Sequence, residues 1–72
     1  MKEQSLTMLK ELLNTKVTVQ VKGRHKLRGS LVQYDNYMNL LLENVEELEG
    51  EQVIARHKVV LVKGGNVQSI TT

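Results

Sequence analysis

A short polar break between two apolar runs holds the residues best suited to bind a ligand. It contains Asp35, Asn36, Tyr37 and, after Met38, Asn39. A carboxylate, two amides and an aromatic ring within five positions combine hydrogen-bond donors and acceptors with a surface for stacking. The alternating runs on either side predict two strands joined as a hairpin, with these side chains at one end. Seen alone, Asp35 and Asn36 are also typical of a plain turn, and Tyr37 of a packing aromatic.

Residues for catalysis or metal binding do not form a known pattern. The chain has no cysteine, and His25 and His57 have no metal-ligand spacing with each other or with a carboxylate pair. A glycine-flanked serine is absent, and Gly64-Gly65 lacks the spacing of a Walker phosphate loop. We therefore expect a protein that is not an enzyme and that uses no cofactor or metal.

The elements that must position the polar break are a short helix and five strands. Leu6, Leu9 and Leu13 recur at helical spacing and predict an amphipathic helix over about 5–13, with Asn14 as its left-handed stop. Alternation or apolar runs predict strands over about 16–22, 26–34, 38–46, 52–62 and 67–70.

Glycines between and within these strands favour a strongly bent sheet. Gly29, inside the second predicted strand, is expected to mark a bend, and the run 47–50 is expected to be a polar turn ending in glycine. The sequence therefore predicts an all-β fold: one domain over residues 1–72, with a short helix followed by a five-stranded antiparallel small barrel.

The small size of the chain points to assembly with other subunits. A core of 72 residues is near the lower limit for independent stability, and disulfides are excluded by the lack of cysteine. The run from Val59 to Val62 is apolar on both faces, so a neighbouring subunit is expected to cover one of them. No apolar run approaches a membrane span or a secretory signal, and we expect a soluble, cytoplasmic protein.

Charges are sorted along the chain although the net charge is only +2. A basic block comprises Lys22, Arg24, His25, Lys26 and Arg28, and an acidic block comprises Glu43, Glu46, Glu47, Glu49 and Glu51. The basic block would attract a polyanion through phosphate contacts, or it would form a solvated hairpin tip.

Two groups of residues, one around the polar break and one near the end of the chain, form recognisable motifs. The first comprises Gly29, Leu31, Asp35, Met38, Asn39, Leu40, Leu42 and Glu46, and the second comprises Val62-Lys63-Gly64-Gly65-Asn66-Val67 and Ile70. With these motifs in this order, the chain resembles the Sm and Sm-like (LSm) family, and most of all its short archaeal members. The resemblance covers nearly the whole chain.

The resemblance implies a ring, usually of seven subunits, joined through the fourth strand of one subunit and the fifth of the next. It implies that uridine-rich single-stranded RNA binds in the pore, and that the ring acts in RNA processing or as a ribonucleoprotein scaffold or chaperone, with RNA-processing proteins as possible partners. The expected interface residues are Val59, Val60, Leu61, Val62 and Val67.

The same resemblance assigns roles at the pore. Tyr37 takes the place of the residue that stacks on uracil, Asn39 that of the residue that reads the base, and Asp35 would hold Asn39 in orientation. Lys63 stands where the family usually has arginine, so weaker stacking and a phosphate contact are expected there. In the family an acidic residue often stands at the position of Gly65, beside Gly64 in the same loop. With glycine there, a ribose or backbone contact is expected to be missing. Lys22 would face the pore.

An alternative function remains open from the sequence. The ring would then be chiefly a protein scaffold with weak or non-specific RNA binding, and the acidic stretch 43–51 or the helix would be its docking surface. A hexamer like that of bacterial Hfq is an alternative assembly, but the Tyr-Lys-His run that is distinctive of Hfq is not present in this chain.

Overall fold

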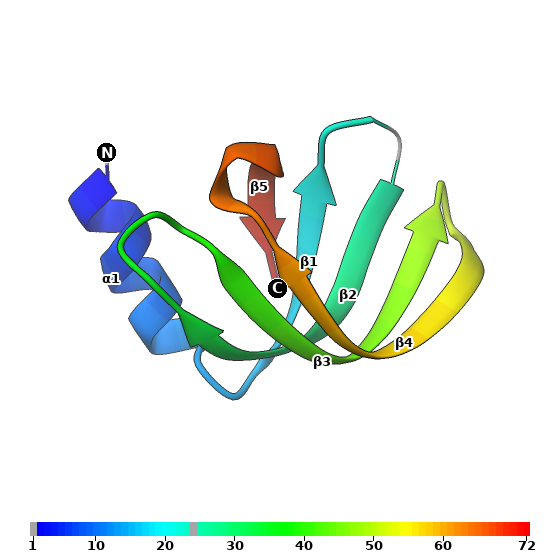
Figure 1. Ribbon diagram of the computed structural model, residues 1–72, viewed down its shortest axis with the longest axis horizontal. Coiled ribbons are helices and arrows are strands. Elements are labelled where there is room, and N and C mark those ends of the chain that lie inside the picture. Colours follow the sequence, from blue (N-terminus) through cyan, green and yellow to red (C-terminus); the bar gives the residue numbers. More distant parts are fainter. Residues whose placement is uncertain (1, 24) are drawn as a thin grey trace.

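A short helix precedes five antiparallel strands that form one bent sheet (Figure 1). The computed structural model describes residues 2–23 and 25–72, with residues 2–5 described by their backbone alone. The elements are α1 (Lys2–Leu12), β1 (Lys16–Val21), β2 (His25–Tyr34), β3 (Leu40–Glu49), β4 (Gln52–Val62), the 3-10 turn η1 (Gly64–Asn66) and β5 (Val67–Thr71). The predicted fold class is confirmed.

The strand order β4-β3-β2-β1-β5 leaves β4 and β5 at the two edges of the sheet. Leu9 of α1 is fully buried, and it joins a core built from four strands. Figure 1 shows α1 beside the loop that connects β2 to β3. The buried strand residues of this core are Val17, Val19, Leu31, Leu40, Leu42, Val45 and Val62. Within the described residues, no helix is long and apolar enough to cross a membrane.

Gly29 lies at a bend of the sheet, as the sequence predicted. The pairing of β2 with β3 shifts register between Arg28 and Ser30, and Asn44 opposite this shift has a left-handed φ of 53°. A Cβ atom at position 29 would lie 2.8 Å from the carbonyl oxygen of Glu43 and 3.0 Å from Cγ2 of Val45. Glycine is therefore required because the two backbones approach closely at the bend.

Several predicted boundaries differ from the structure. The helix begins at residue 2 rather than 5, because apolar periodicity marks only the turns that pack on the core. Asn14 does end the helix region with a left-handed φ of 64°. The third strand spans Leu40–Glu49 instead of 38–46, so the predicted polar turn at 47–50 is wrong for its first three residues.

The longer β3 is explained by burial and by charge pairing across strands. Leu48 is 5% exposed, and neighbouring carboxylates contact basic side chains on β2 and β4. Arg28 Nη2 lies 2.9 Å from Glu46 Oε1, and His25 Nδ1 lies 2.8 Å from Glu47 Oε2. The basic and acidic blocks therefore partly neutralise each other on adjacent strands. Arg24, a member of the predicted basic block, lies outside the described residues.

Candidate functional site

The carboxylate of Asp35 organises the loop between β2 and β3. Its Oδ1 accepts hydrogen bonds from the backbone N–H groups of Tyr37, at 2.9 Å, and Asn39, at 3.0 Å. Its Oδ2 accepts a hydrogen bond of 2.8 Å from the side-chain Nδ2 of Asn39. This turn puts Met38 at a left-handed φ of 63°, which explains why β3 begins at Leu40 and not at residue 38.

These bonds stabilise the charged form of Asp35. The hydrogen bond from the Asn39 side chain is the main cause, and together with the two backbone N–H donors it holds the pKa of Asp35 below its ordinary value of 3.8. At neutral pH the carboxylate is therefore ionised and acts only as an acceptor.

Asn39 connects this loop to the loop between β4 and β5. Its Oδ1 accepts a hydrogen bond of 2.8 Å from the backbone N–H of Gly64. A Cβ atom at position 64 would clash with the carbonyl oxygen of Tyr37, so the two loops approach too closely for any side chain there. An amide has two donor hydrogens and two acceptor lone pairs, so Asn39 keeps one donor and one acceptor for a ligand.

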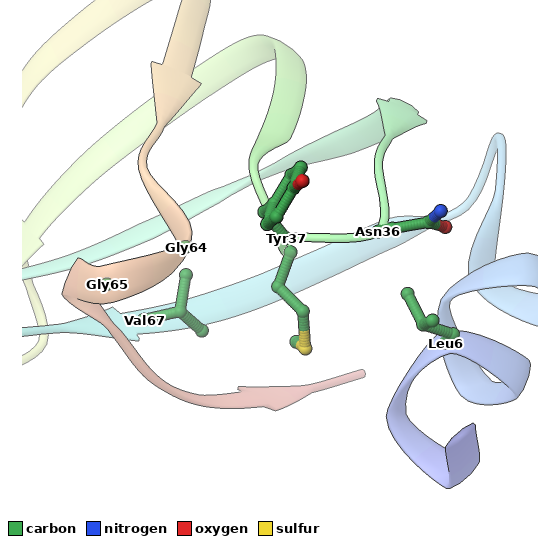
Figure 2. Close-up of a pocket in the computed structure, with 7 residues that line it drawn as sticks. Leu6, Asn36, Tyr37, Gly64, Gly65 and Val67 are labelled. Carbon is green, nitrogen blue, oxygen red and sulfur yellow. The ribbon is translucent and has the colours of Figure 1, made fainter. Parts of the chain in front are cut away.

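Tyr37 presents its ring to solvent beside this connection. The residue is 82% exposed, whereas Tyr34, the other tyrosine, packs against the core. Next to Tyr37 is a hollow of about 330 Å³, which we name the loop pocket, between the two loops and α1 (Figure 2). Its lining residues are Leu6, Asn36, Tyr37, Met38, Gly64, Gly65 and Val67.

Sequence reasoning missed the contribution of the helix to this pocket. Leu6 belongs to the apolar stripe of α1, and Figure 2 shows it facing the pocket across from Val67 of β5. The spacing of the stripe indicated burial but not which loop the helix would approach. Contacts between residues so distant in sequence leave no local pattern.

Lys63 and Lys22 lie together, although they do not line the loop pocket. Both line a separate hollow of about 350 Å³ with the end of β4. The backbone N–H of Lys22 donates a hydrogen bond of 2.9 Å to the carbonyl oxygen of Asn66, which joins the β1–β2 turn to η1. Of the predicted binding residues, the structure thus groups Asp35, Tyr37, Asn39, Gly64 and Gly65 in one cluster and the two lysines in another.

The predicted interface residues divide into two groups. Val59 and Leu61 are 56% and 64% exposed and project from the edge strand β4. Val62 is buried in the core, and Val60 and Val67 pack against it. As the alternation predicted, one apolar face of this run, with Val60 and Val62, is covered within the subunit, and the other face, with Val59 and Leu61, is left exposed. The assignment of these residues to a subunit interface stays a prediction.

The titratable side chains give no indication of a metal centre. Among residues 2–23 and 25–72, no group of three or more His, Cys, Asp or Glu side chains has the geometry to hold a metal ion. The arrangement around Asn39 is instead suited to recognising a planar ligand by stacking and by a fixed donor and acceptor pair.

The chain is similar to known proteins over most of its length. The LSM domain family model matches residues 7–72. An Sm-like protein of Methanosarcina acetivorans is 40% identical over 67 residues, which cover 93% of each chain.

Two solved structures share the fold. The Sm protein of Pyrococcus abyssi, in complex with a uridine heptamer, superposes with a TM-score of 0.89 at 29% identity, over 92% of this chain and 93% of that one. The P. aerophilum SmAP1 heptamer gives a TM-score of 0.83 at 32% identity, over 90% of this chain and 86% of the other.

Proposed function

Because the chain belongs to the LSM domain family, we propose that it is a non-enzymatic RNA-binding protein that forms a homo-oligomeric ring and binds uridine-rich single-stranded RNA at the pore. The observation that carries the proposal is the exposed Tyr37 ring beside the Asn39 amide, which Asp35 and Gly64 hold from both sides. The uridine heptamer bound to the similar P. abyssi protein supports the same ligand class.

The held amide gives a physical reason for choosing uracil. Asp35 accepts only from Nδ2 and the Gly64 N–H donates only to Oδ1, so the Asn39 amide cannot flip. Uracil presents an acceptor at O4 beside a donor at N3, whereas cytosine presents a donor at N4 beside an acceptor at N3. A fixed amide that places its donor at O4 and its acceptor at N3 of uracil forms two hydrogen bonds. With cytosine in the same position, donor would meet donor and acceptor would meet acceptor. Stacking on Tyr37 would add about 1–3 kcal/mol for any base.

The strand order supports the ring. β4 and β5 are both edges with unpaired backbone on one side, so β4 of one subunit would pair with β5 of the next. Head-to-tail contacts form a ring when the rotation between subunits closes, and the similar P. aerophilum protein is a heptamer, so seven subunits are proposed here. A cytoplasmic location, supported by the absence of cysteine, and contacts with RNA-processing proteins belong to the same proposal.

The test is the binding of labelled oligouridine and oligocytidine to the wild-type protein and to Asn39→Ala, measured by fluorescence anisotropy at two salt concentrations. We expect uridine-selective binding that Asn39→Ala weakens by about tenfold, as loss of roughly 1.4 kcal/mol of hydrogen bonding would require. Gln52→Ala, which removes an exposed amide at the start of β4 and away from the loop pocket, is the control and should bind as the wild type does.

Light scattering of each variant separates binding from assembly. A wild-type particle mass for Asn39→Ala, together with lost uridine selectivity, supports the proposal. Weak binding that is equal for both bases and abolished by salt would refute it and favour the protein scaffold. Disassembly of Asn39→Ala would mean that the amide is structural.

A further inference from the structure

A row of polar and charged residues crosses the sheet away from the loop pocket. The strand register aligns Thr18 of β1, Arg28 of β2, Glu46 of β3 and Arg56 of β4. Glu46 lies seven residues beyond Asn39, a path along the chain of roughly 23 Å at about 3.3 Å per residue. The row is therefore distinct from the residues proposed to bind uracil.

Glu46 separates two arginines in this row. Arg28 donates hydrogen bonds of 2.9 Å from Nη2 and 3.2 Å from Nε to Oε1, while Arg56 Nη2 is 3.5 Å from Oε2. The bond from Arg28 is the main reason that the pKa of Glu46 lies below its ordinary value of 4.5. Each guanidinium has five N–H donors, so both arginines retain donors for a second anion.

Two lysines extend the positive charge of the row. Lys16 and Lys58 are both exposed, and they line a hollow of about 420 Å³ together with Arg56 and Glu46. Arg56 is 73% exposed and Arg28 is 41% exposed at their side chains. We name Lys16, Arg28, Arg56 and Lys58 the lateral cationic surface.

The surface carries more positive than negative charge. Glu46 lies within it, and Glu43 lies beside it, since Ser30 pairs with both Lys16 and Glu43 in the strand register. Glu47, 3.0 Å from the lining residue His57, is a third carboxylate nearby, so four cations are set against three carboxylates. Neither tyrosine of the chain lines the hollow, and the one ring that does, that of His57, has its Nε2 atom 3.0 Å from Glu47 Oε1. The surface therefore offers mainly charge and N–H donors.

We propose that the lateral cationic surface binds the phosphate backbone of RNA outside the uridine tract, independently of base sequence. The inference rests on the proposed function, because the RNA held at the pore would supply the neighbouring phosphates. Arginine and lysine on an uncovered sheet face are suited to phosphodiester oxygens, and such contacts carry no base information. Their strength depends on salt because bound counterions are released.

The experiment compares two labelled RNAs, a short oligouridine and the same oligouridine with an oligocytidine tail. Affinities of the wild-type protein, Lys58→Gln and Lys16→Gln are measured by anisotropy over a range of salt concentrations. We expect each variant to bind the tailed RNA several-fold more weakly, with a salt slope smaller by about 0.7 for each phosphate that the variant no longer neutralises. Binding of the short oligouridine should not change.

Lys10→Gln is the matched control, since Lys10 is an exposed lysine on α1 and its substitution removes the same charge. Equal effects of Lys58→Gln and Lys10→Gln on the tailed RNA would overturn the proposal. The proposal would also be overturned if polyglutamate bound in a Lys58-dependent way and the oligocytidine tail did not, because the surface would then be assigned to an acidic protein. If the wild-type protein does not bind the short oligouridine, the proposed pore function fails, yet a Lys58-dependent contribution of the tail still supports this surface.

Discussion

At the scale of single residues, Gly64 and Gly65 are adjacent but meet different surroundings. A Cβ atom at position 64 would run into the backbone of Tyr37 and Met38, whereas one at position 65 would meet nothing within 4 Å. The first glycine allows the contact between the two loops, and the second leaves the mouth of the loop pocket open.

We therefore expect Gly64→Ala to force the two loops apart and break the bond from its N–H to Asn39. The expected loss is about 1–3 kcal/mol of unfolding free energy, measured by urea denaturation, together with loss of oligouridine binding. Gly65→Ala is the control and should unfold as the wild type does. Equal stability of the two variants would contradict the close approach of the loops.

The Asp35 carboxylate gives this loop a defined pH dependence. Its pKa is lowered in the folded protein, chiefly by the Asn39 side chain, relative to about 3.8 in the unfolded chain. Its contribution to stability is therefore fully present above pH 3.8 and is lost as the pH falls through the lower, folded value. Unfolding free energies of the wild type and Asp35→Ala should differ at pH 7 and converge in strong acid. A difference that does not depend on pH would exclude the carboxylate as the cause.

The sequence predicted part of this site and could not have predicted the rest. Asp35, Tyr37 and Asn39 lie within one turn, so their types and spacing were enough to bring them together. The bond between Asn39 and Gly64 spans 25 positions, and only the motifs of a known family connected these residues beforehand. The helical Leu6 was visible as a packing residue but not as part of the loop pocket.

At the scale of elements, the strands were predicted best where polar residues are exposed and apolar residues are buried. The predicted bounds of β4, 52–62, are those of the structure. For β3 the run of glutamates indicated a turn, but Arg28 and His25 on β2 make those glutamates favourable in a strand. A local pattern does not contain the charges of a neighbouring strand, so this boundary depended on the tertiary fold.

The edge strand β4 carries the prediction on assembly. Leu61 is exposed on β4, and a lysine there would place a charge in the proposed contact with the neighbouring β5. We expect Leu61→Lys to shift the protein from a ring toward monomers, as measured by light scattering at several concentrations.

Ile54→Lys is the control for this shift. Ile54 is 44% exposed near the other end of β4, and β5, with five residues, is too short to pair with all eleven of β4. This variant should keep the particle mass of the wild type. An unchanged mass for Leu61→Lys would refute the placement of the interface.

At the scale of the whole molecule, the loop of residues 63–66 has an unusual position. It begins where β4 ends and finishes where β5 begins, so it connects the two opposite edges of the sheet. In the proposed ring these edges would contact two different neighbours. The loop that donates the Gly64 N–H to Asn39 would thus be fixed at each end by a separate subunit.

Because of this position, each base-binding site would be fully ordered only when both neighbouring subunits are present. In a subunit with one neighbour missing, one end of the loop would join a strand whose outer edge has no partner, and its Asn39 amide would be held less firmly. Open chains of subunits would then have defective sites at both ends, whereas a closed ring has none. Ring closure would in this way limit RNA capture to complete particles.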